Sequence, residues 1–361
     1  MKRHERVSTD AMQNPDVSRP ARSVRRPHAT RWLRLDTGRS APNGLPTRRV
    51  LLLVVALLIQ AGLQRAEADD FAWVEAADRL SLRHGDRPVA DYVIRDETIL
   101  RPYFANLHTP DGRQVTRNHP PRSGQDATDH DTMHPGLWMA FGDINGQDFW
   151  RNKGRIEHVR FIEPPRLSGG RLTFAAENRL KTSDGHILGR QISRISLSRL
   201  PEGFLLIWQA EFVPGDHDLV FGDQEEMGLG VRVATGITEK NGGIIRSSTG
   251  ARSAKQTWGR SFDWCDYAGE IDGARVGVTL MPDPANFRTS WFHNRDYGLM
   301  VANPFGRKAM NQGEASRFVV KKGERFTLQF GAYLHTTPLA GQAELPSAYR
   351  RFLDEKTPAR Q

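Results

Sequence analysis

The sequence predicts an all-β protein, a large antiparallel β-sandwich with one short C-terminal helix. Three observations predict it. The apolar runs are short and rich in β-branched and aromatic residues. Gly, Pro, Asp or Asn residues separate these runs, as turns between strands require. No alternation of strands with long helices is visible, and this argues against a doubly wound nucleotide-binding fold.

The N-terminal segment predicts export. Residues 1–46 are rich in Arg, Pro, Ser and Thr, show no apolar period and should be disordered, and a start at Leu45 would leave residues 1–44 untranslated. Residues 47–68 read as a signal peptide: Arg48 and Arg49 precede an apolar run, about 14 residues long, and small residues flank Glu67 before the expected cleavage after Ala68. The product would be periplasmic or secreted, with no stable membrane span.

Two alternatives remain open for this segment. The pair of arginines also loosely resembles a twin-arginine export signal, although an ordinary Sec signal fits equally well. An uncleaved anchor is the alternative to cleavage, and about 14 apolar residues are few for a membrane span.

The basic charge belongs to the leader. Residues 1–68 carry 13 Lys and Arg against 5 Asp and Glu, whereas residues 69–361 carry 38 against 37. The mature chain therefore has no excess of positive charge that would predict a nucleic-acid partner. Its single cysteine, Cys265, cannot form an internal disulfide and should be a buried structural thiol.

Residues 69–361 read as a single β-sandwich domain, since no repeat or linker interrupts them. Residues 190–198 alternate polar and apolar side chains, as a half-exposed strand does. A short amphipathic helix is expected at 346–354. The other expected strands are residues 71–75, 89–94, 171–175, 204–208, 228–233, 274–280 and 325–330.

The densest polar segment lies at residues 129–150. His130 and His134 can exchange protons near neutral pH, and Trp138 offers an aromatic face for a sugar ring. Asp143 and Asn145 add groups that could bind hydroxyls. The segment suits a metal-free carbohydrate cleft, but two other interpretations stay open. The His-x-x-x-His spacing could hold a metal, or the loop could be structural with satisfied histidines.

Two later segments complete the candidate site. Glu226 precedes a Gly-rich strand that ends at Arg232, and a carboxylate there could act as a general base; a solvated acidic turn is the alternative. Residues 291–298 pack donors, acceptors and aromatics into a short stretch. Its candidates for the site are Trp291, His293, Arg295 and Asp296, and the alternative is an Arg–Asp pair that fixes a loop.

Several motifs carry a resemblance. Residues 143–150 (Asp-Ile-Asn-Gly-x-Asp-Phe-Trp), 295–298 (Arg-Asp-Tyr-Gly) and 302–306 (Ala-Asn-Pro-Phe-Gly) occur in this order. Together with residues 101–104 and 226–232, they resemble a secreted bacterial family labelled the PmoA family, or methane oxygenase PmoA. Members often carry a fuller run of histidines where this chain has two.

The resemblance implies a β-sandwich like that of galactose mutarotase and related sugar-active proteins. Its label implies a metal-dependent oxygenase, yet one short apolar stretch cannot build a multispanning membrane subunit. We therefore expect an exported carbohydrate-active protein that acts on or binds a small sugar or oligosaccharide. His130 or His134 and Glu226 would move protons in it, joined by His293. Trp138, Arg232 and Arg295 would hold the sugar. A non-catalytic carbohydrate-binding protein and the oxygenase are the alternatives, and no cofactor is specified.

Overall fold

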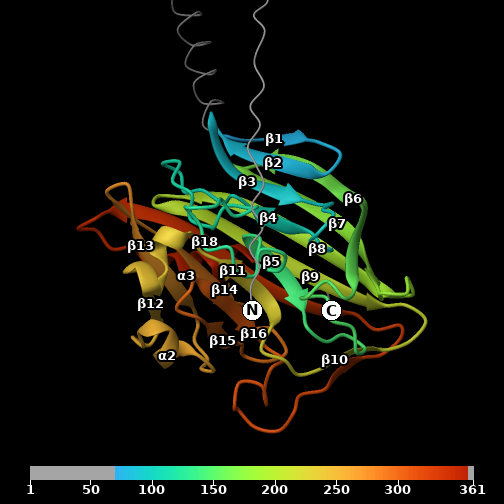
Figure 1. Ribbon diagram of the computed structural model, residues 1–361. Helices are drawn as coiled ribbons and strands as arrows, with labels where there is room; N and C mark the ends of the chain where they lie inside the picture. Colours follow the sequence, from blue (N-terminus) through green and yellow to red (C-terminus); the bar gives the residue numbers. More distant parts are fainter. Residues whose placement is uncertain (1–69, 357–361) are drawn as a thin grey trace, which may run out of the picture. The chain divides into compact units, whose positions relative to one another are not determined.

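The computed structural model describes residues 70–356, so the predicted leader and signal peptide lie outside the described residues. Two eight-stranded sheets face each other, and every strand pairing in them is antiparallel (Figure 1). A two-stranded sheet flanks them. The predicted all-β sandwich with a short C-terminal helix is confirmed.

The first sheet has the strand order β1-β2-β3-β4-β5-β11-β16-β15. Its strands are β1 (Phe71–Glu75), β2 (Arg79–His84), β3 (Arg87–Val93), β4 (Tyr103–Ala105), β5 (Leu137–Phe141), β11 (Met227–Arg232), β16 (Leu299–Asn303) and β15 (Trp291–Asn294).

The second sheet has the order β12-β13-β14-β18-β9-β8-β7-β6. Its strands are β12 (Ile244–Ser247), β13 (Cys265–Ile271), β14 (Ala274–Pro282), β18 (Phe326–Pro338), β9 (Gly203–Pro214), β8 (Ile187–Leu200), β7 (Arg171–Lys181) and β6 (Arg155–Ser168). The remaining elements are β10 (Leu219–Phe221), β17 (Phe318–Val320), the 3₁₀ turns η1 (Thr235–Ile237) and η2 (Glu239–Asn241), and the helices α2 (Ser253–Thr257) and α3 (Leu345–Glu355).

The main core lies between the inner faces of the two sheets. Phe104 from the first sheet meets Trp208 from the second edge to face, with ring centroids 5.4 Å apart. Phe141 and Phe212 repeat this contact at 5.2 Å. Because successive residues of a strand point to opposite faces, alternate residues of β3, β4, β5 and β16 face away from this core. A second apolar cluster forms there and includes Trp138 and Val301.

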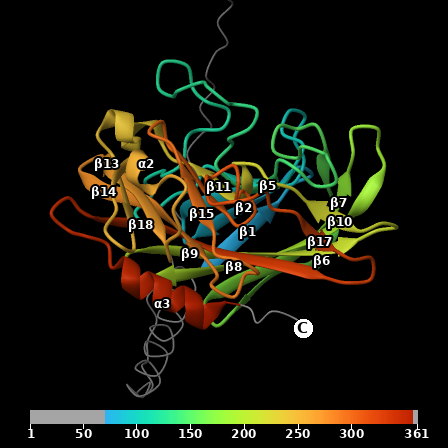
Figure 2. The same ribbon diagram turned by 90° about the horizontal axis from the view of Figure 1, so that it is seen from below.

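Helix α3 confirms the predicted C-terminal helix. Pro346 occupies the first turn, where a missing N–H costs nothing. The apolar side of the helix covers the outer face of the second sheet (Figure 2). Phe352 lies over Gly331, where a Cβ atom would be only 2.9 Å from its ring. The close packing of the helix on the sheet therefore requires a glycine at this position of β18.

Several predicted strands are longer than the sequence indicates, such as β8 with 14 residues and β18 with 13, and β6 is a further strand of 14. Strand β6 was not predicted, since Pro164 and Pro165 interrupt it. It lies at the edge of its sheet and pairs only with β7 among the described strands. Its register shifts three times, and prolines are tolerated in strands at such edges and bulges. As predicted, Cys265 is buried.

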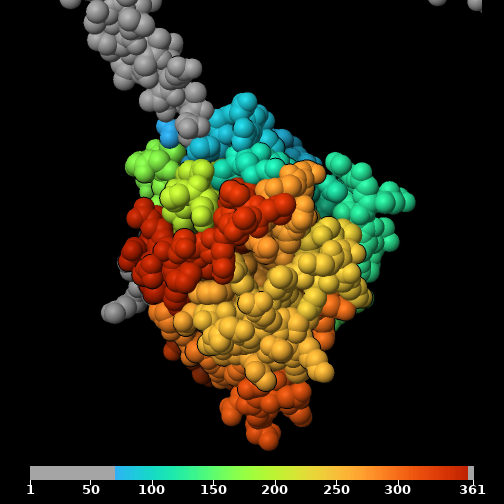
Figure 3. All heavy atoms as spheres, turned by 90° about the vertical axis from the view of Figure 1, so that its left-hand side faces the viewer, coloured from blue at the N-terminus to red at the C-terminus, as the bar shows by residue number. Residues whose placement is uncertain are grey.

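The segment after β11, with η1, η2 and α2, lies at the surface of one side of the molecule (yellow to gold in Figure 3). None of the helices between Asp70 and Lys356 is long and apolar enough to span a membrane.

Candidate functional site

The loop that carries the two candidate histidines is held by buried arginines. Arg117 donates to the carbonyl oxygens of Ala127 at 2.8 Å, Asp129 at 2.6 Å and His134 at 2.9 Å. Arg101, also buried, donates to the carbonyl of Met133. Backbone carbonyls in an irregular loop lack the partners that a strand would supply. The guanidinium groups supply them, and this fixes the loop.

The third buried arginine, Arg232, holds the loop through a side chain. Its two terminal nitrogens donate to the two carboxylate oxygens of Asp129 at 2.9 and 2.7 Å. Burial alone would raise the pKa of Asp129, but hydrogen bonds from Arg232 and His130 hold that pKa well below its usual range. The predicted sugar contact at Arg232 is wrong, since the side chain is buried and its charge is matched inside the protein.

Four aromatic rings stack in a row under this loop. His130 lies between Tyr297 at 5.7 Å and His134 at 5.0 Å, and His134 lies on Trp138 at 5.1 Å, as measured between ring centroids. Gly230 makes room for the row, because a Cβ atom there would be 2.9 Å from the Trp138 ring. Although His130 lies between two rings of the row, 41% of its side chain is exposed.

The predictions for His134 and Trp138 are corrected by their burial. His134 is 2% exposed and Trp138 is fully buried. The indole N–H of Trp150 donates to Nε2 of His134 at 3.4 Å, and burial lowers the pKa of His134 well below its usual value. A neutral, enclosed imidazole cannot protonate a sugar, and Trp138 has no free face to offer one.

The same stack bears on the metal hypothesis. The rings of His130 and His134 are nearly parallel, with 26° between their planes. The nitrogen lone pairs lie in these planes, so the two rings do not direct them at a common point. Nε2 of His134 already accepts from Trp150. Within residues 70–356, no group of three or more His, Cys, Asp and Glu side chains is arranged to hold a metal. The donor set does not fit an ion.

A second group of charges lies at the start of β11. The carboxylate of Glu225 pairs with Arg295 at 2.9 Å, and that of Glu226 pairs with Arg151. Arg151 also binds Asp148 at 3.0 Å. Burial raises the pKa of Glu226 above its usual value, although the charge of Arg151 opposes this. Glu226 is 18% exposed, so it is partly desolvated yet open to a ligand.

His293 supports this group from below and does not exchange protons near neutral pH. Burial, together with the charges of Arg295 and Arg151, lowers its pKa to about 3. The indole N–H of Trp258 donates to its Nδ1 at 3.2 Å. An indole nitrogen can only donate, so neutral His293 carries its proton on Nε2. His293 is buried and lies 3.4 Å from the Glu225 carboxylate, so in this structure it supports the group, and its catalytic role stays a prediction.

Tyr297 joins the two groups. The guanidinium carbon of Arg232 lies 4.6 Å from its ring centroid. Burial raises the pKa of Tyr297, and the charges of Arg232, Arg295, Asp129 and Glu226 all act on it. The ring of Tyr297 therefore lies between Arg232 and His130. We give the name carboxylate patch to the charged and aromatic side chains Asp129, His130, Arg151, Glu225, Glu226, Arg295 and Tyr297.

The other predicted residues lie elsewhere or serve the backbone. Asp143 accepts from the N–H of Gly146, and Asn145 accepts from the backbone N–H of Val220 at 2.7 Å; both side chains serve the backbone here, and their sugar contacts stay predictions. The Arg288 guanidinium lies 5.7 Å from the ring of Trp291. Asp296 is exposed and faces Lys240 at 3.7 Å.

Four residues of the patch were not predicted as site residues: Asp129, Arg151, Glu225 and Tyr297. Arg151 directly follows the motif at 143–150, and Tyr297 lies inside the motif at 295–298. Their positions beside motifs already singled out were the available signal. Glu225 and Asp129 directly precede the predicted Glu226 and His130. Nothing in the sequence indicates Trp258, because its contact with His293 spans 35 residues.

Several proteins of known structure are similar to this chain in fold. No curated protein matches the sequence significantly. A galactose mutarotase-like protein from Clostridium acetobutylicum is similar in structure, with 7% identity, a TM-score of 0.37, and coverage of 74% of this chain and 98% of that one. Galactose 1-epimerase from Lactobacillus acidophilus has 8% identity and a TM-score of 0.35, with coverage of 74% of this chain and 98% of that one. A galactose mutarotase-like protein from Lactobacillus casei has 9% identity and a TM-score of 0.32, with coverage of 73% of this chain and 100% of that one.

At such low identities and TM-scores, these structures do not indicate the activity of this chain. Its function is therefore inferred from its own residues. The resemblance to a family labelled as methane oxygenase stays a prediction. Residues 79–350 match the model of a family of unknown function, DUF6807. This match spans most of the chain, which therefore belongs to the family of unknown function DUF6807.

Proposed function

We propose that this protein is an exported carbohydrate-active enzyme that binds a sugar over the carboxylate patch and moves a proton on it with Glu226. The observation that carries the proposal is the environment of Glu226. Its carboxyl is partly desolvated, its pKa is raised by burial, and it remains accessible beside Arg151. A carboxyl whose pKa is shifted toward neutrality is suited to general acid–base catalysis.

The groups around Glu226 suit a polyol. Glu225 and Arg295 form a half-exposed ion pair, which offers acceptors and donors side by side to neighbouring hydroxyls. Tyr297 and His134 cover the two faces of the His130 ring, so the partly exposed His130 would meet a sugar with its edge. A small number of placed polar groups beside aromatic surface is the usual composition of a ligand site.

His130 is the proposed partner of Glu226 in proton transfer. Its Nδ1 lies 2.8 Å from the Asp129 carboxylate, which can only accept when ionised. The carboxylate therefore holds the proton on Nδ1 and leaves Nε2 to exchange one with a ligand. Asp129 is itself held by Arg232, so the orientation of His130 is set from inside the fold.

The test combines a sugar panel with an isosteric variant. Purified protein from Asp69 onward is screened on a glycan array, and turnover is followed by polarimetry and product analysis. We expect Glu226→Gln to lower turnover by about 10²–10⁴-fold and to leave binding nearly unchanged. Glu270→Gln is the matched control, because Glu270 is exposed on β13.

Three results would change the assignment. Binding without turnover in the wild type would make the protein a non-catalytic carbohydrate-binding protein. Equal turnover in Glu226→Gln and wild type would remove Glu226 from the mechanism. Failure of the wild type to bind any sugar in the panel would overturn the proposal.

A further inference from the structure

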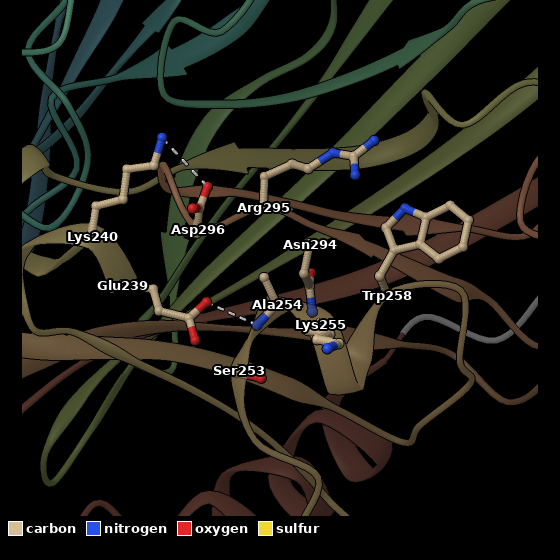
Figure 4. A pocket seen from close by; sticks show the side chains of 9 residues that line it. All are labelled: Glu239, Lys240, Ser253, Ala254, Lys255, Trp258, Asn294, Arg295 and Asp296. Carbon is tan, nitrogen blue, oxygen red and sulfur yellow. Dashed lines mark hydrogen bonds and ion pairs between the residues drawn. The ribbon is translucent and has the colours of Figure 1, made fainter.

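A pocket of about 600 Å³ opens beside the carboxylate patch (Figure 4). Three elements supply its walls. Glu239 comes from η2, Ser253 and Lys255 come from α2, and Asn294 and Arg295 come from the end of β15 and the turn after it. Trp258, which follows α2, lies on the same side of the pocket as Arg295 in the close view (Figure 4).

The pocket and the patch share Arg295, and Trp258 connects the pocket to His293 under the patch. Arg295 lines the pocket and pairs with Glu225 of the patch. Trp258 lines the pocket, and its indole N–H binds His293 under the patch. The guanidinium carbon of Arg295 lies 6.0 Å from the Trp258 ring centroid. A molecule bound over Glu225 could therefore continue into the pocket across these two side chains.

Asn294 gives the pocket a built acceptor. The Thr257 hydroxyl donates to the carbonyl of Ser253 at 2.8 Å, so its oxygen must accept from Nδ2 of Asn294 at 2.8 Å. This fixes which side of the amide is Nδ2. The side chain is 1% exposed, and its Oδ1 has no hydrogen-bond partner among residues 70–356.

An unsatisfied buried acceptor is costly, typically about 1–3 kcal/mol. A hydroxyl donor from a ligand would remove that cost. Most charges of the lining are already matched, since Glu239 accepts from the backbone of Ala254 at 2.9 Å and Lys240 faces Asp296. The pocket thus offers an aromatic wall at Trp258, and one of its lining residues, Asn294, carries a buried acceptor without a partner among residues 70–356.

We propose that this pocket is a second sugar subsite, so that the natural ligand is a linked di- or oligosaccharide and not a free monosaccharide. One unit lies over the carboxylate patch. The next unit lies against Trp258, with a hydroxyl that donates to Oδ1 of Asn294. This inference rests on the proposed function of the patch.

The test measures affinity against chain length. Calorimetry with the mature protein uses one to four units of four series: cello-, xylo-, chito- and galacturono-oligosaccharides. In the series that binds, we expect two units to bind at least about tenfold more tightly than one, which is about 1.4 kcal/mol. The comparison uses the wild type and does not depend on a variant folding.

Variants at Trp258 then locate the gain. Trp258→Ala should reduce the ratio of disaccharide to monosaccharide affinity to about one, while Trp258→Phe, which keeps an aromatic face, should keep most of it. Trp73→Leu on β1 is the control and should keep the wild-type ratio. Using a ratio cancels any effect that loss of the His293 contact has on the patch.

The outcomes separate the two proposals. Equal affinity for one and two units in the wild type would overturn the second subsite and leave the proposed function intact. An unchanged ratio in Trp258→Ala would also overturn the subsite at this pocket. Absence of any sugar binding would overturn both proposals.

Discussion

Arg232 shows how a single side chain organises the candidate site. It ends a strand of the first sheet, and its charge is matched by an aspartate from a loop 103 residues earlier in the chain. Tyr297 covers the same guanidinium. Removing the carboxylate would leave a buried charge without its partner, which costs more than the pair itself contributes.

We therefore predict that Asp129→Ala lowers the free energy of unfolding by about 2 kcal/mol, less than the 3–5 kcal/mol of a fully buried pair because Asp129 keeps contact with water. Urea unfolding followed by fluorescence measures this. Asp131→Ala, an exposed neighbour in the same loop, should change it by less than about 0.5 kcal/mol. Equal effects of the two variants would contradict the organising role of the pair.

Among the elements, α3 depends most visibly on a single contact. Phe352 is fully buried, and Gly331 of β18 leaves the space for its ring. Glu355, at the C-terminal end of the helix, accepts from the Ser198 hydroxyl at 2.7 Å and pairs with Arg171 at 2.8 Å. The helix is therefore fixed by apolar packing in its body and by polar contacts at its end.

We predict that Phe352→Ala lowers the free energy of unfolding by about 3–5 kcal/mol, since it removes a buried aromatic ring and leaves a cavity. The exposed Arg350 on the same helix is the control, and Arg350→Ala should stay within about 0.5 kcal/mol of the wild type. Thermal and urea denaturation would both report the loss. A Phe352→Ala protein as stable as the control would show that α3 contributes little to the fold.

Prediction from sequence worked best where strand periodicity is local. The alternation at 190–198 and the apolar run at 274–280 both lie within observed strands, β8 and β14. The candidate site was harder to predict, because its residues come together through strand pairing. Trp138 and Gly230 are opposite each other across β5 and β11, and no local pattern gives that register. His134 stacks on the Trp138 ring that Gly230 leaves room for, so its burial was missed. The catalytic role of Glu226 stays a prediction.

At the scale of the whole molecule, four histidines favour the neutral form because burial lowers their pKa values. Burial lowers the pKa values of His108, His134, His158 and His293, the last to about 3. Each of these folded-state values lies below the unfolded-state value of about 6.5. The contribution of these histidines to the free energy of unfolding is therefore full above about pH 6.5. It decreases as the pH falls, because the unfolded chain binds protons that the folded chain does not.

We predict that the free energy of unfolding falls between pH 6.5 and pH 5, with His293 alone contributing about 2 kcal/mol at about 1.4 kcal/mol per pH unit. Urea unfolding at several pH values tests this. His293→Gln should flatten the profile by that amount, while His217→Gln, at an exposed position, should leave its slope unchanged. A His293→Gln profile parallel to the wild type would contradict the neutral, buried assignment.

The edge strand β6 has a consequence for behaviour at high concentration. Fourteen residues of exposed edge would ordinarily be a template on which a second copy could add its own strand. Pro164 and Pro165 carry no N–H to donate, and three register shifts, the last of them across the two prolines, make the strand irregular between His158 and Arg166. This edge therefore resists aggregation, and replacing both prolines by valine would open a route to fibrous association that the native sequence blocks.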